Sequence, residues 1–365
     1  MTWAARCDVN FAKSISAGRA TLVRPECLRS FPFGTRGEGL EVELPEKSPS
    51  IQIGALRESE LAEARRIVCL AFGTFMGMAN PLEFMGDRDF VAPRWRARNT
   101  QVLAARENGK LIGINVATRW GSFAFFGPLT ILPDYWNRGV AQRLLAATMK
   151  VFDKWGVIRS GLYTFPHSAK HIGLYQRFGY WPGHLTALMR MVPQSRVAPV
   201  TKNAKPVVLL SALSRGESEK AIRACAKLAG GILKGLDLSE EIAAVLKQRI
   251  GEVILVEGRN SLDAFAVCMH GPGSEGGAKT IYVKFAAARG GPGSGDRFTR
   301  LLEAIESWAL ERSAEVEAGV SLNCVDAFRR MQANGYQAFT QGVAMQQPHG
   351  EGYNSRGAYV INDWR

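Results

Sequence analysis

The sequence predicts an α/β fold, more narrowly α+β, made of two tandem modules that each contain a mixed, mostly antiparallel sheet flanked by helices. The chain has 365 residues, which is long for one domain and favours two. Segments with helical and strand periodicity alternate along both halves. An internal repeat supports the same division. Gly179 and Gly335, each followed by Tyr, lie 156 residues apart, and the Leu-Leu pairs that begin at 144 and 301 lie 157 apart.

The first module opens with a strand and an amphipathic helix, and a β-hairpin turned at Asn108-Gly109 comes later. The expected elements are a strand at 50–57, a helix at 59–72, a second helical segment ending at Trp95, strands at 101–109, 110–121 and 123–132, a helix at 139–155, a strand at 157–165, a helix at 171–179 and a strand at 184–191.

The second module repeats this order. Its expected elements are a strand at 207–213, helices at 218–229 and 239–250, strands at 252–258, 263–271 and 280–288, a helix at 297–312, a strand at 318–322, a helix at 327–335 and a strand at 342–346. The predicted organisation is a poorly ordered leader at 1–49, a catalytic module at 50–193, a linker at 194–206, a degenerate module at 207–346 and a tail at 347–365. The apolar tail residues Tyr359, Val360 and Trp364 are expected to dock on one module.

The composition is that of an ordinary globular protein, with 46% hydrophobic and 22% charged residues. Six cysteines without a C-x-x-C pair argue against a metal site or a disulfide framework, and they favour a reducing, cytoplasmic location. The uncharged apolar stretch 120–133 is too short to span a bilayer, so no membrane association is expected. The Arg-rich first 30 residues resemble a transit peptide, but a disordered leader is the preferred interpretation.

The positive charge is concentrated in the middle of the chain. The net charge is +13, and residues 51–200 carry 19 basic and 9 acidic side chains. Such a local excess indicates an anionic ligand. The sequence has no lysine run, RNP-like aromatic pattern or recognition helix, so a compact phosphate ligand is favoured over nucleic acid.

A glycine turn between the strand ending near Pro133 and the next helix is the candidate phosphate site. The first amides of a helix have no intrahelical partner and, with the helix dipole, can bind an anion. Gly139 lets the backbone approach a diphosphate, Ala141 keeps the first turn uncrowded, and Arg138 and Arg143 add charge. The alternative is a plain strand–turn–helix connection.

The element order, the strand end 129–133, the loop 136–141 and the stretch from Ser168 to Gly179-Tyr180 together resemble the GNAT superfamily of acyl-CoA-dependent N-acyltransferases. The resemblance covers residues 51–193 and, more weakly, 207–346. The family loop reads Gln/Arg-x-x-Gly-x-Gly/Ala, and Trp136 departs from its first position. The resemblance implies that loop amides hold the pyrophosphate and that the strand end pairs with the pantetheine arm. The implied acyl-CoA contacts are Leu129, Thr130, Ile131, Asn137, Arg138, Gly139, Val140, Ala141, Gln142, Arg143 and Ser168.

The resemblance also implies the chemistry. Acetyl-CoA would be a co-substrate, with no permanently bound cofactor, and the acetyl group would pass directly to a primary amine of a small amine or peptide acceptor. Tyr175, four residues before Gly179, would be the general acid, and the alternative is a core aromatic. His167 is a candidate general base, with an exposed loop residue or a water chain as the alternatives. His171 would be either a surface residue or a contact to CoA or substrate.

The second module lacks these groups. Met331 stands at the position of Tyr175, and the loop GGPGSGD contains Pro292, which has no amide hydrogen, and Asp296, which would repel phosphate. Buttressing, lining the substrate cleft or forming a homodimer would be its remaining roles. For the whole chain, a non-catalytic CoA-binding or scaffold protein, a transferase for a longer acyl-CoA and a nucleic-acid binder are the alternatives.

Overall fold

The structure is a computed structural model that describes residues 51–194 and 207–365. The predicted leader at 1–49 and all but the first residue of the predicted linker lie outside the described residues. The predicted α/β architecture with tandem repeats is confirmed, and the elements keep the predicted order with bounds that shift by a few residues.

The first half of the described chain comprises β1 to β6. Its strands and helices are β1 (Ile51–Ala55), α1 (Leu61–Phe75), α2 (Ala92–Trp95), β2 (Thr100–Glu107), β3 (Lys110–Trp120), β4 (Phe123–Ile131), α3 (Val140–Lys154), β5 (Arg159–Thr164), α4 (Ala169–Gln176) and β6 (Trp181–Met191). The hairpin forms as predicted, because Asn108 and Gly109 both take positive φ, 50° and 79°.

The second half comprises β7 to β12, and the short strand β13 follows it. The elements are β7 (Val207–Leu209), α5 (Arg215–Ile232), α6 (Ser239–Gln248), β8 (Gly251–Glu257), β9 (Leu262–Gly271), β10 (Gly277–Ala288), α7 (Ser294–Leu310), β11 (Glu315–Ser321), α8 (Val325–Ala333), β12 (Gln337–Gln347) and β13 (Val360–Ile361). The repeat is visible in these bounds, since α4 and α8, and likewise β6 and β12, begin 156 residues apart.

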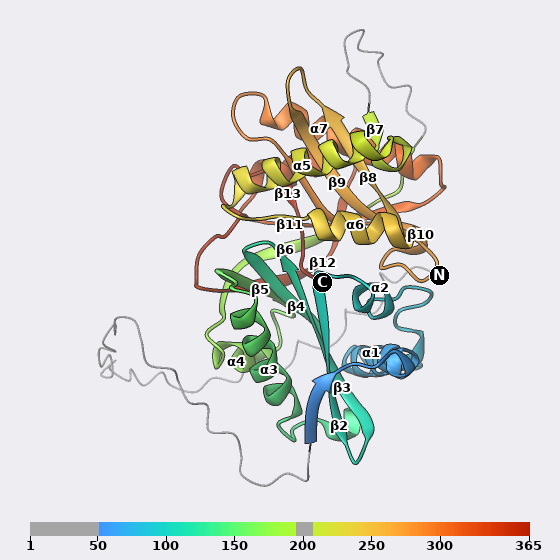
Figure 1. Ribbon diagram of the computed structural model, residues 1–365, viewed down its shortest axis with the longest axis vertical. Coiled ribbons are helices and arrows are strands. Elements are labelled where there is room, and N and C mark those ends of the chain that lie inside the picture. Colours follow the sequence, from blue (N-terminus) through green and yellow to red (C-terminus); the bar gives the residue numbers. More distant parts are fainter. Residues whose placement is uncertain (1–50, 195–206) are drawn as a thin grey trace, which may run out of the picture. The chain divides into compact units, whose positions relative to one another are not determined.

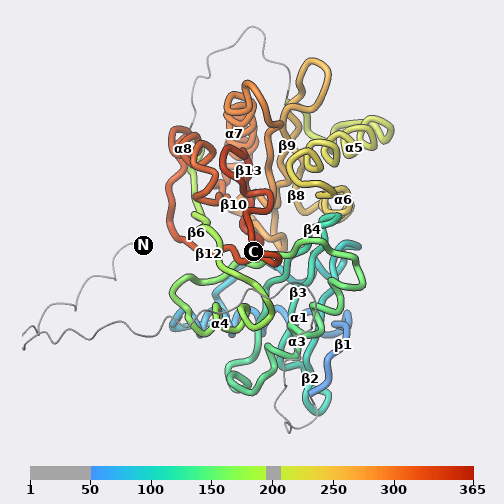
Figure 2. The backbone as a smooth tube through the Cα atoms, turned by 90° about the vertical axis from the view of Figure 1, so that its left-hand side faces the viewer, coloured from blue at the N-terminus to red at the C-terminus, as the bar shows by residue number. Residues whose placement is uncertain are grey.

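One sheet runs through both halves in the order β1-β2-β3-β4-β5-β12-β6-β11-β10-β9-β8-β7, with β13 beside β10. Only β4–β5 and β10–β11 are parallel pairs. The last strand of each half crosses to the other half. β12 pairs with β5, β6 pairs with β11, and β6 and β12 pair with each other (Figures 1 and 2). The two repeats are therefore joined by exchanged strands.

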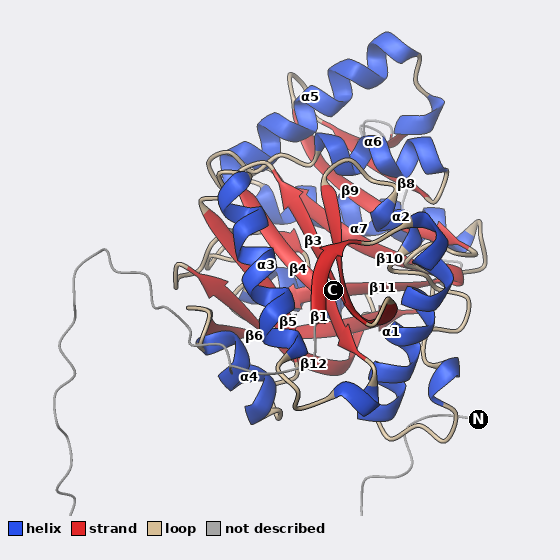
Figure 3. Cartoon of the chain, turned by 60° about the horizontal axis from the view of Figure 1, so that its bottom comes forward, coloured by secondary structure: helices blue, strands red, loops and turns tan. Residues whose placement is uncertain are grey.

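In the first half, two helices pack on the sheet and form the hydrophobic core with it. α1 packs on β3 and β4, and α3 packs on β1 to β4. Figures 1 and 3 show α1 and α3 on opposite sides of these strands. Buried residues from both helices, including Ile67, Leu144 and Leu145, form one cluster with the strands. Among the described helices, none is both long and apolar enough to cross a membrane.

The sequence predicts that the tail docks on one module. In the structure the tail packs on both halves. Val360 and Ile361 pair with β10 of the second half. The Trp364 ring lies 5.1 Å from the ring of Phe123 in the first half and 5.6 Å from that of Tyr353 in the tail, measured between centroids. Large apolar side chains are removed from water in this way, which is the physical reason for docking.

Candidate active site

The strands β4 and β5 separate after a short parallel pairing. Their ladder covers only residues 123–125 of β4. Beyond it β4 continues along β3 through Ile131, with a bulge at which the partner of Asn115 is Leu129 and the partner of Ala117 is Phe126. β5 is paired on its other side by β12. The edge of β4 over 126–131 that faces away from β3 therefore has no strand partner among the described residues, and it is open to an extended ligand.

The turn before α3 presents a run of free amides. Asn137 and Gly139 adopt left-handed conformations with φ of 63° and 74°, and Gly139 is the N-cap of α3. Within the described chain, no amide from residue 137 to residue 142 donates a hydrogen bond, and the next one, that of Arg143, donates to the Gly139 carbonyl at 3.2 Å. The Trp136 indole braces the turn by donating to the Ile131 carbonyl at 2.8 Å. Such a run at a helix N-terminus can bind an anion.

A cavity of about 390 Å³ lies between this turn, β4, α1 and α4. Most of the residues predicted from the sequence line it: Leu129, Thr130, Ile131, Asn137, Gly139, Val140, Ala141, Gln142 and Tyr175. His171, which the sequence left open between a surface residue and a contact to CoA or substrate, also lines the cavity. Residues that the sequence analysis did not assign complete the wall: Ala71, Phe72, Phe75, Tyr135, Trp136, Phe165, Lys170, Leu174 and Arg177.

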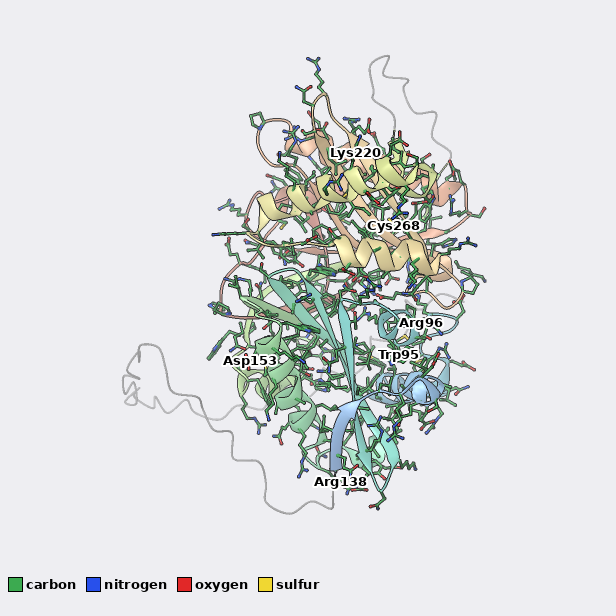
Figure 4. All side chains as sticks on the ribbon, in the orientation of Figure 1. Trp95, Arg96, Arg138, Asp153, Lys220 and Cys268 are labelled. Atoms are coloured by element: carbon green, nitrogen blue, oxygen red, sulfur yellow. The ribbon has the colours of Figure 1, made fainter. Side chains whose placement is uncertain are left out.

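The other predicted residues lie outside the cavity wall. Arg138, labelled in Figure 4, donates to Glu107 at 2.6 Å beside the β2–β3 hairpin and lies over the Tyr135 ring at 4.7 Å. Arg143 lies in the first turn of α3. Ser168 caps α4, its Oγ accepting from the His171 amide at 3.5 Å. The His167 ring packs against Phe75, 6.2 Å between centroids. Their functional roles stay predictions.

Tyr175 is placed beside the open edge of β4. Its side chain is 7% exposed, and its ring lies 5.7 Å from that of Phe126 in β4. Burial raises the pKa of Tyr175 to about 12, although a side-chain hydrogen bond with Thr164 acts in the opposite direction. The phenol therefore keeps its proton at neutral pH and can donate it within the cavity.

His171 lies one turn before Tyr175 on the same face of α4. Its ring packs on Phe75 at 5.1 Å, and its Nδ1 is buried without a hydrogen-bond partner among the described residues. Burial lowers the pKa of His171, and the charges of Lys170 and His167 lower it further. Lys170 Nζ donates to Asn137 Oδ1 at 2.6 Å and so links α4 to the turn. The four-residue helical spacing from Leu174 is the sequence signal that could have found Lys170.

The equivalent turn of the second half has a similar glycine conformation but different side-chain surroundings. Gly293, with φ 76°, is the N-cap of α7. The Arg297 guanidinium donates to the carbonyls of Arg289, Gly290, Gly291 and Pro292 at 2.8–3.2 Å. Arg330 covers the start of α7, since a Cβ placed on Gly295 would lie 2.3 Å from Arg330 Nη2. Met331 is fully buried. Arginine side chains therefore border this turn, and the residue at the position of Tyr175 carries no acidic proton.

Three comparisons bear on the family of the chain. Residues 74–180 match the model of the acetyltransferase (GNAT) family. A search of curated proteins finds no match. Among solved structures, the fold is similar to a protein from Pyrococcus horikoshii assigned as an acetyltransferase, with a TM-score of 0.63 and 14% identity over 88% of this chain and 97% of that one.

Two further structures share the fold. A GCN5-related N-acetyltransferase from Sphaerobacter thermophilus has a TM-score of 0.53 and 13% identity, over 81% of this chain and 95% of that one. A tandem GNAT protein from the clavulanic acid biosynthesis pathway has a TM-score of 0.50 and 11% identity, over 81% of this chain and 98% of that one. Residues 74–180 therefore match a GNAT-family acetyltransferase domain, and the chain shares its fold with solved acetyltransferase structures that include one tandem GNAT protein.

Proposed function

We propose that the first half is an acetyl-CoA-dependent N-acetyltransferase that acts on a primary amine of a small molecule or peptide. One observation carries this proposal: the free amides from Asn137 to Gln142, the open edge of β4 and the protonated phenol of Tyr175 all border one cavity. Acyl-CoA has three parts that match them, a diphosphate, an extended amide-bearing arm and a thioester. The GNAT family match over the same residues supports the assignment.

The binding mode follows from these groups. The diphosphate would lie on the amides at the start of α3, with Lys170 and Arg177 as cations in the same wall. The pantetheine arm would extend the sheet along Leu129 and Thr130. This path leads the thioester along β4 toward Phe126, where Tyr175 lies.

The transfer itself needs two proton movements. The neutral amine attacks the thioester carbonyl, and the C–S bond then breaks as the amide forms. Tyr175 would give its proton to the departing thiolate, a contribution typically worth about 10²–10⁴-fold. The amine proton would leave to a base or to water. His167 remains a candidate base. His171 is a second candidate, because it lines the cavity and its lowered pKa favours the neutral imidazole that can accept a proton.

A second candidate is transfer of a longer acyl group. Phe72, Phe75 and Phe165 line the cavity on the α1 side. Phe165 directly follows Thr164, the hydrogen-bond partner of Tyr175, so the apolar rings lie near the expected position of the thioester. An apolar wall at that point suits a chain longer than acetyl.

A thiol-release assay tests both candidates. The purified chain is incubated with acetyl-, butyryl- or hexanoyl-CoA and a panel of small amines and peptides, and free CoA thiol and acylated amine are measured together. We expect amine-dependent thiol release with one acyl-CoA strongly preferred. Saturable acyl-CoA binding without thiol release for any amine would instead support a CoA-binding protein without catalysis.

A further inference from the structure

The hairpin loop between β9 and β10 holds the segment that precedes α2. The Gly273 amide donates to the Asp87 carbonyl at 2.9 Å, and the Asp89 amide donates to the Ser274 carbonyl at 3.0 Å. The Ala278 amide donates to the Asp87 carboxylate at 2.7 Å. The second half therefore fixes a part of the first half that is far from both exchanged strands in sequence.

Arg94 of α2 extends this contact to β4. Its side chain is 2% exposed. Nε and Nη2 donate to the two carboxylate oxygens of Glu275 at 2.9 and 2.7 Å, and Nη1 donates to the Gly127 carbonyl at 2.7 Å. Nη2 also contacts the main-chain oxygen of Arg365. A single planar guanidinium thus joins the second half, the β4 bulge and the tail.

Glu275 is itself held in a buried charge cluster. It accepts from Lys284 at 2.6 Å, and Lys284 also pairs with Glu241 at 2.9 Å. Burial alone would raise the pKa of Glu275, but the charges of Arg94 and Lys284 outweigh burial and lower it to about 2. Two cations and two anions balance. Because desolvation offsets much of the attraction in buried ion pairs, such a cluster is weak evidence for stability and fits a role in fixing geometry.

Gly127 lies at the point where the acyl-CoA opening begins. β4 leaves β5 after Phe125, the bulge against β3 follows, and Leu129 is the first β4 residue of the cavity wall. We propose that Arg94 is a positioning residue: held by Glu275 of the second half, it anchors the Gly127 carbonyl and so sets the course of β4 past the cavity. This inference rests on the proposed function for the identity of the ligand, but the anchoring of β4 can be measured without any ligand.

The test uses Arg94→Lys in the full chain, with Arg88→Lys as the matched control. Arg88 also bridges the halves, pairing with Glu317 at 3.1 Å, but its hydrogen bonds go to Glu317 and Thr280 and not to β4. We expect Arg94→Lys to speed hydrogen exchange in peptides covering 126–131 and to weaken acetyl-CoA binding about 10-fold, with Arg88→Lys changing neither. Glu275→Gln should have the same effects to a smaller degree. This variant replaces Arg94→Lys in the test if Arg94→Lys does not fold.

Hydrogen exchange and acetyl-CoA binding together distinguish a failure of the positioning role from a failure of the proposed function. Unchanged exchange at 126–131 in a folded Arg94→Lys or Glu275→Gln chain would overturn the positioning role. Equal acceleration across both halves, in these variants and in Arg88→Lys alike, would also overturn it, since that is general destabilisation. Local acceleration in the variants, together with a wild-type chain that binds no acyl-CoA, would keep the anchor and remove the proposed function instead.

Discussion

Two glycine turns with similar glycine conformations stand at equivalent places in the two halves, but their hydrogen bonding and side-chain surroundings differ. Gly139 and Gly293 have φ of 74° and 76°, and each begins a long helix. In the first turn six successive amides have no partner within the described residues. In the second turn Pro292 has no amide hydrogen, the Ser294 amide is bonded to Gly291, and the Arg297 guanidinium binds the loop carbonyls. Backbone shape alone therefore does not make an anion site. The neighbouring side chains decide whether the amides are accessible.

The largest effect on kcat is expected at Tyr175, whose equivalent in the second half, Met331, has no acidic proton. Tyr175→Phe should lower kcat about 10²–10⁴-fold while the Kd for acetyl-CoA stays the same, because only the proton donor is lost. Steady-state thiol release and calorimetric binding measure the two quantities. Tyr180→Phe, which removes a buried hydroxyl bonded to Ser160 at 2.7 Å, is the control and should leave kcat nearly unchanged. Full turnover in Tyr175→Phe would remove this phenol from the mechanism.

The two glycines themselves form a matched pair of variants. Gly139→Ala and Gly293→Ala each place a Cβ in the left-handed region and should each lower the free energy of unfolding by about 1–2 kcal/mol. Only Gly139→Ala should raise the KM for acetyl-CoA, by about 10-fold, because its Cβ would stand where the diphosphate meets the amides. Thermal melts and kinetics on both variants provide the comparison. Equal KM changes in the two would mean that the turns do not differ in function.

A smaller effect is expected from the cations near the turns. Arg138 is already paired with Glu107 and its side chain is 35% exposed, so Arg138→Gln should raise the KM for acetyl-CoA only about 2- to 4-fold, and less in high salt. Arg289→Gln beside the second turn, where Arg289 pairs with Asp263 at 2.7 Å, should leave the KM unchanged. A large, salt-independent loss in Arg138→Gln would place this side chain in direct contact with the ligand.

The smallest change is expected in the dependence of kcat on pH. A proton donor acts while it is protonated, and burial raises the pKa of Tyr175 to about 12. We therefore expect no fall in kcat from loss of this proton between pH 7 and about pH 10. A decline centred near pH 10 that disappears in Tyr175→Phe would mean that the phenol titrates as it does in water.

The order of elements and about half of the cavity wall could be predicted because the signals are local. The Asn108-Gly109 turn, the glycine before α3 and the spacing of Tyr175 from Gly179 are all short-range patterns. His171 was named from the sequence as a surface residue or a contact to CoA or substrate. Its packing against Phe75 could not be predicted, because that contact joins α4 to α1.

The exchange of β6 and β12 and the role of Arg94 could not be predicted from the sequence. Alternation along β6 indicates which side chains are buried, but β5 and β11 offer equivalent edges, and periodicity does not select between them. In the sequence, Arg94 is one of several nearby arginines, a pattern typical of a surface segment. Its carboxylate partner is 181 residues away, and no local pattern connects them.

The stoichiometry of acetyl-CoA binding tests the contrast between the two turns most directly. Isothermal titration of the full chain should give one site per chain, still one site in Gly293→Ala and in Tyr175→Phe, and a weakened site in Gly139→Ala. Two sites per chain, or a single site that Gly293→Ala weakens and Gly139→Ala leaves intact, would contradict the account.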